Sequence, residues 1–116
     1  MLTDAPLIFE KRAGRSASTV IFALQGPLTL RNLFDLQTAL RQEPVSSFFI
    51  LDLTGVPYMD SAGIGLVMNH YVHCQNGGGR MIVTGVCPRV MELFRLTHID
   101  AVLGQAATVE DAESLA

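Results

Sequence analysis

The chain has 116 residues, of which 49% are hydrophobic and 16% charged, and 8 basic against 11 acidic residues give it a net charge of −3. This length is typical of one domain, and the apolar content is sufficient for a packed core. The acidic excess and the lack of a basic cluster argue against nucleic-acid binding through phosphate neutralisation. No apolar run approaches the roughly 20 residues that cross a membrane, and no signal-like pattern begins the chain, so we expect a cytoplasmic protein with no membrane partner.

Apolar, β-branched runs alternate along the chain with segments of helical periodicity. The runs predict strands at residues 7–9, 19–24, 48–53, 80–84 and 101–103. Helices are expected at 30–42, from 61 to the glycines at 77–79, from 87–88 onward and at 109–115. The order ββαβαβαβα predicts a single α/β domain over residues 1–116. Its sheet should be mixed but mostly parallel, because strands joined by helices run parallel, and its helices should pack largely on one side.

Three of the predicted helices carry interpretable side-chain patterns. In the helix that begins at residue 61, one apolar stripe is predicted to be buried, and it contains Ile64, Val67, Met68, Tyr71 and Val72. The opposite side should carry His70 and His73, and Leu96 is a candidate for the buried side of the following helix. Thr108 is a plausible N-cap for the last helix.

The segment around Ser61 is the most informative part of the sequence, because an apolar strand there gives way to a helix. A serine in the first turn is either a structural N-cap, worth about 1 kcal/mol, or an accessible hydroxyl. A phosphate on it would lie beside unpaired N–H groups and the positive end of the helix dipole. Gly63 and Gly65 weaken a helix, so either a partner approaches the backbone closely or the helix packs tightly on a neighbouring strand.

Other chemistry receives less support from the pattern. His70, His73 and Cys74 are close in sequence, but no second cluster completes a metal site. Cys74 and Cys87 are expected to be two buried or half-buried thiols and not a disulfide pair. Ser61 has no evident base, and the glycines at 77–79 lead into a strand and lack a phosphate-binding signature. We therefore predict no catalytic residues, no cofactor and no metal, and we expect that the protein is not an enzyme.

Three segments together resemble the STAS domain family, and most closely its stand-alone bacterial anti-sigma factor antagonists. They are residues 58–65 (YMDSAGIG), 77–83 (GGGRMIV) and 88–97 (PRVMELFRLT). The similarity extends over almost the whole chain, and the predicted element order agrees with that of the family.

The resemblance implies a phosphorylation-switched regulator. The motif serine, Ser61, would be phosphorylated by an anti-sigma factor with serine kinase activity, and a PP2C-type phosphatase would reverse this. The unmodified protein would bind the kinase and free a sigma factor. Partner contacts are implied for Thr29, Asp60, Ser61, Ala62, Gly63 and Gly65.

Two features of the resemblance leave partner choice open. Many antagonists have an acidic residue where the segment Gly26-Pro27-Leu28-Thr29 places Thr29. STAS domains also serve as docking modules in transporters and stress-sensing scaffolds, without phosphorylation. That role is the alternative hypothesis.

Overall fold

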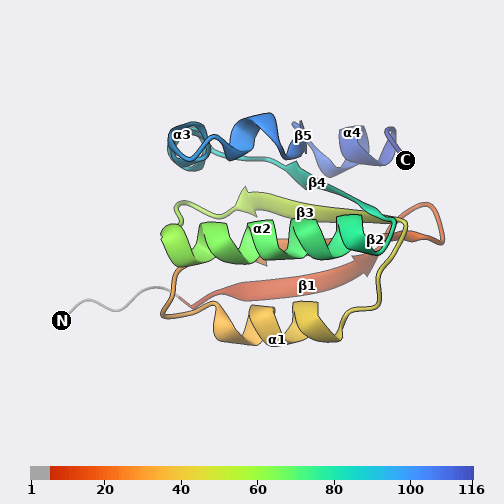
Figure 1. The fold of residues 1–116 in the computed structure, drawn as a ribbon, viewed down its shortest axis with the longest axis horizontal. Coiled ribbons are helices and arrows are strands. Elements are labelled where there is room, and N and C mark those ends of the chain that lie inside the picture. Colours follow the sequence, from red (N-terminus) through yellow and green to blue (C-terminus); the bar gives the residue numbers. More distant parts are fainter. Residues whose placement is uncertain (1–5) are drawn as a thin grey trace.

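The computed structural model describes residues 6–116 and contains one five-stranded sheet in the order β1-β2-β3-β4-β5. Strand β1 runs antiparallel to β2, and every other neighbouring pair is parallel (Figure 1). The strands are β1 Ile8–Ala13, β2 Thr19–Gln25, β3 Phe48–Gly55, β4 Arg80–Thr84 and β5 Gly104–Ala106. The helices are α1 Phe34–Gln42, α2 Ser61–Asn76, α3 Pro88–Leu96 and α4 Val109–Glu113, with a 3₁₀ turn at Ile99–Ala101. The predicted mixed, mostly parallel α/β fold is confirmed.

The two faces of the sheet are covered unequally. Phe22, Phe49 and Leu51 belong to the main core, which also takes in buried side chains of α1, α2 and α3. On the other face, a small second cluster includes Ile50 and Ala112, and so brings in α4. Alternation along each strand sends successive side chains to opposite faces, so both clusters draw on the same strands. The prediction that helices pack largely on one side is confirmed.

Several predicted element boundaries are wrong. The first strand is Ile8–Ala13 and not 7–9, since all six of those residues pair with β2. The first helix begins at Phe34 and not at residue 30, because the chain before it is held in a loop by contacts described below. The last strand is Gly104–Ala106 and not 101–103, since only those residues pair with β4. The last helix ends at Glu113, while Thr108 caps its start by accepting the Asp111 N–H at 3.1 Å, as predicted.

Helix α2 is rotated relative to the predicted stripe. Ile64 and Val67 are buried, but Val72 is 48% exposed and His70, expected on the outer side, is only 6% exposed. Because α2 is apolar around much of its circumference, periodicity did not fix which side faces the sheet. Leu96, at the end of α3, is also exposed. Within residues 6–116, none of the helices combines the length and apolar content needed to span a membrane.

Candidate functional site

Ser61 is the first residue of α2 and lies exposed at the end of the connection from β3. It is not the N-cap. That position belongs to Asp60, which has extended backbone angles and whose side chain accepts the Gly63 N–H at 2.9 Å. The interpretation of Ser61 as an ordinary cap is therefore wrong, because the carboxylate one residue earlier already satisfies the helix terminus. The Ser61 hydroxyl makes no hydrogen bond within the described part of the chain, and the residue is exposed.

Asp60 also fixes the loop between β2 and α1. Its second carboxylate oxygen accepts the Leu30 N–H at 3.0 Å. The backbone N–H of Leu28 donates to the Tyr58 carbonyl at 3.1 Å, and the Leu28 carbonyl accepts the Asp60 N–H at 3.3 Å. Two loops 30 residues apart in sequence thus form one surface beside Ser61.

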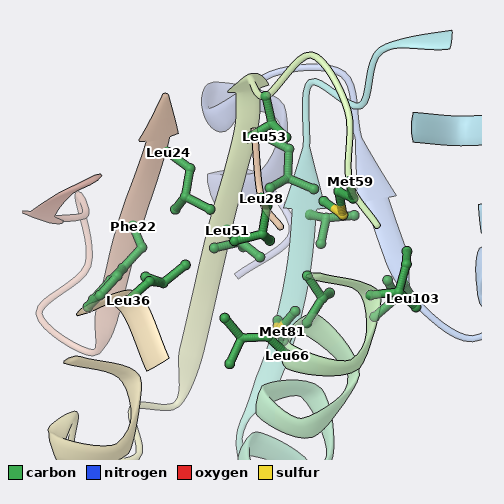
Figure 2. Packing of buried hydrophobic residues seen from close by; sticks show 14 of the residues in the cluster. Phe22, Leu24, Leu28, Leu36, Leu51, Leu53, Met59, Leu66, Met81 and Leu103 are labelled. Carbon is green, nitrogen blue, oxygen red and sulfur yellow. The ribbon is translucent and has the colours of Figure 1, made fainter. Parts of the chain in front are cut away.

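The Leu28 side chain anchors this surface to the core. It is fully buried, and Met59, with which it forms an isolated parallel bridge, is 7% exposed. Figure 2 shows both side chains among the leucines of β3. Sequence reasoning did not identify Leu28 or Leu30 as site residues, since no local pattern links them to Asp60.

The two glycines near the start of α2 differ in how closely other residues pack against them. A Cβ on Gly63 would lie 2.2 Å from the Leu28 carbonyl oxygen, so this glycine is required by packing against the neighbouring loop. A Cβ on Gly65 would have nothing within 4 Å. Internal packing therefore accounts for Gly63 and leaves Gly65 unexplained. Ala62, immediately before Gly63, is half-buried.

Thr29 lies in the loop beside Asp60 but is only 5% exposed. Its backbone N–H and hydroxyl both donate to the Asn32 side-chain oxygen, at 2.8 and 3.2 Å. Its neighbour Leu30 is 57% exposed, and Phe34, at the start of α1, is 56% exposed. Leu30 and Phe34 thus present apolar surface on either side of Arg31, which is also exposed, whereas Thr29 shapes the loop from inside.

Removing the Asp60 carboxylate should destabilise the fold by about 1.5 kcal/mol, because Asp60→Ala loses a helix cap and leaves the Leu30 N–H without its acceptor. Asp60→Asn keeps one acceptor oxygen and should lose less. Urea denaturation with an unchanged m-value would measure both effects. A loss for Asp60→Ala below about 0.5 kcal/mol, the range of ordinary surface substitutions, would contradict this assignment.

The remaining candidate groups are buried or make hydrogen bonds that stabilise the fold. Cys74 and Cys87 are free thiols, the first buried and the second partly buried, as predicted. Burial raises the pKa of Cys74 to about 11. Asp52 accepts the Thr54 and Thr84 hydroxyls at 2.6 and 3.0 Å, which ties the ends of β3 and β4 together. Within residues 6–116, no three His, Cys, Asp or Glu side chains come together as a metal-binding group.

Comparison with known proteins agrees with this architecture. Residues 10–112 match the model of the STAS domain, so the chain belongs to the STAS domain family. Its fold is shared with an anti-sigma factor antagonist from Mycobacterium paratuberculosis (17% identity, 97% of each chain covered, TM-score 0.84). It is also shared with the phosphorylated Bacillus cell-fate determinant SpoIIAA (19% identity, 94% of this chain and 100% of that chain, TM-score 0.72).

The same fold occurs within a larger membrane protein. The murine anion transporter Slc26a9 matches 90% of this chain at 17% identity and a TM-score of 0.73, but the match covers only 18% of the transporter. At identities this low, the likeness concerns the fold alone.

Proposed function

We propose that this protein is an anti-sigma factor antagonist, a binding regulator without catalysis of its own that is switched by phosphorylation of Ser61. The observation that carries the proposal is that the helix cap and the exposed hydroxyl at the start of α2 belong to two different residues. Asp60 caps the helix, so the exposed Ser61 hydroxyl is free to accept a phosphoryl group. The similarity in fold to SpoIIAA, a protein solved in a phosphorylated form, supports phosphorylation as the means of switching.

In this proposal, the partner of the unmodified protein is an anti-sigma factor with serine kinase activity. It docks on the surface formed by Leu30, Phe34 and the first turns of α2. Leu30 and Phe34 supply exposed apolar area. Gly65, which no internal contact requires, lets the partner approach the helix backbone closely.

Phosphorylation then acts by local electrostatics. It adds about −1.5 to −2 charges to Ser61, next to the carboxylate of Asp60 and on a surface where Leu30 and Phe34 are exposed. Docking would bury that charge and is opposed by its desolvation. The fold need not change, because a helix N-terminus accommodates negative charge. A PP2C-type phosphatase would restore the binding form.

Ser61→Asp should therefore weaken binding to the cognate anti-sigma factor at least about tenfold, which is ~1.4 kcal/mol, while leaving thermal stability almost unchanged. Calorimetric titration with the candidate anti-sigma kinases of the same genome would measure this. The matched control is Ser47→Asp, which makes the same change of charge at an exposed position just before β3, whereas Ser61 follows that strand. It should bind like the unmodified protein.

The kinase step is tested separately by incubation with ATP and mass spectrometry. The protein should gain one phosphoryl group at Ser61, and Ser61→Ala should gain none. If Ser61→Asp binds every cognate kinase normally and no phosphoryl group is acquired, the switch is wrong. The alternative is then a docking module of a transporter or stress-sensing scaffold, which the fold match inside the larger Slc26a9 chain favours.

A further inference from the structure

A cleft of about 200 Å³ lies between α1 and α2, which run side by side over one face of the sheet (Figure 1). Apolar and polar groups both line it. Leu40 and Leu66 provide apolar surface, while Gln37, Arg41, Asn69 and His70 are among the polar lining. All of these α2 residues lie beyond the first turn that carries Ser61, so the cleft is distinct from the site proposed for phosphorylation.

His70 is an unusual lining residue because it is buried yet incompletely bonded. Its side chain is only 6% exposed, its ring meets Phe49 edge-on at a centroid distance of 4.3 Å, and its Nε2 atom has no hydrogen-bond partner within residues 6–116. Burial, and secondarily the charge of neighbouring His73, lower the pKa of His70 to about 4. The ring is thus neutral at pH 7, with one N–H to donate and one lone pair to accept. A buried polar group left in this state lacks a stabilising contact that a ligand could provide.

The charge of the cleft selects the kind of ligand. Arg41 makes no ion pair within residues 6–116, and no carboxylate lines the cleft. A guanidinium presents paired N–H donors that match a carboxylate. Since a cavity of about 150 Å³ can hold benzene, this cleft admits a molecule slightly larger than that.

We propose that the cleft between α1 and α2 binds a small organic carboxylate of about the size of benzoate. The ligand's carboxylate contacts Arg41 and hydrogen-bonds with the polar lining at His70 and Asn69. The ligand's apolar body covers Leu40 and Leu66. Nothing in this proposal depends on Ser61, so ligand binding in the cleft and the phosphorylation switch can each fail without the other.

Titration of ¹⁵N-labelled protein with sodium benzoate, followed by NMR, tests the proposal. We expect saturable shifts at Gln37, Asn69 and His70, with a Kd on the order of 1 mM, as suits so small a ligand. Arg41→Gln should weaken binding at least about tenfold. The matched control is Arg95→Gln on α3, which removes the same charge from an exposed side chain outside the cleft and should bind normally.

Inorganic phosphate provides the second arm of the experiment. It carries charge without an apolar body and should shift the same resonances much less than benzoate. Absence of saturable shifts with benzoate, equal binding to Arg41→Gln, or equal binding of phosphate would each overturn the proposal.

Discussion

Gly63→Ala is expected to destabilise the protein by about 3 kcal/mol, at the upper end of the cost of overpacking a close contact. The added Cβ would lie 2.2 Å from the Leu28 carbonyl oxygen and 3.1 Å from its carbon. Both are backbone atoms, so no side-chain rotation relieves the overlap. The Leu28 backbone cannot retreat without breaking its hydrogen bonds to Tyr58 and Asp60 and displacing a fully buried side chain.

Gly65→Ala is the matched control for this prediction. It introduces the same methyl group two residues later in α2, where nothing lies within 4 Å, and should stabilise the protein by about 0.5–1 kcal/mol through helix propensity. Guanidinium denaturation of both variants would give the difference. Similar effects of the two substitutions would show that the loop containing Leu28 does not pack on α2 as described.

Lowering the pH from 6.5 to about 4 is expected to remove up to about 3 kcal/mol of stability through His70. In the folded protein, burial and then His73 lower the pKa of His70 from 6.5 to about 4. The unfolded chain binds a proton at about pH 6.5, so unfolding takes up a proton throughout this interval. The stability is therefore fully present above pH 6.5 and is lost progressively as the pH falls toward 4.

Denaturation curves recorded across this pH interval for the wild type and for His70→Gln provide the measurement. The variant should lose most of the slope, whatever its absolute stability. His73→Gln serves as the control on the same helix, because it removes only the smaller of the two causes and should keep most of the slope. An unchanged slope in His70→Gln would show that His70 is not the titrating group.

The fold class was predictable because strand and helix periodicities alternate clearly over most of the chain. The buried runs at β2, β3 and β4 were located within one or two residues, and the two-sided apolar character of β3 arises from clusters on both faces of the sheet. The errors concern places where tertiary contacts override local pattern. Residues 30–33 look helical in sequence but form a loop, because Asp60 and the bridge between Leu28 and Met59 hold that segment.

For the candidate site too, some features were predictable from local pattern and others depended on tertiary contacts. Local pattern identified the start of α2, its small residues and the importance of Ser61. Of its two interpretations of Ser61, the N-cap was wrong, since serine and aspartate are both good caps and adjacent positions differ only in backbone conformation. It also could not tell whether Gly63 and Gly65 serve packing or docking. The neighbour of Gly63 is Leu28, 35 positions earlier, whereas a Cβ on Gly65 would meet nothing within 4 Å.

The sequence by itself determined that this chain forms one α/β fold of the STAS type and that Ser61 stands where a strand leads into a helix. These properties depend on periodicity, capping chemistry and a motif, all of which are local. Only the tertiary structure decided that Asp60 caps α2, that Leu30 joins the surface beside Ser61 and that His70 is buried next to a cleft. Each of these depends on which distant segment packs against a given side chain, and such contacts leave no periodic trace in the sequence.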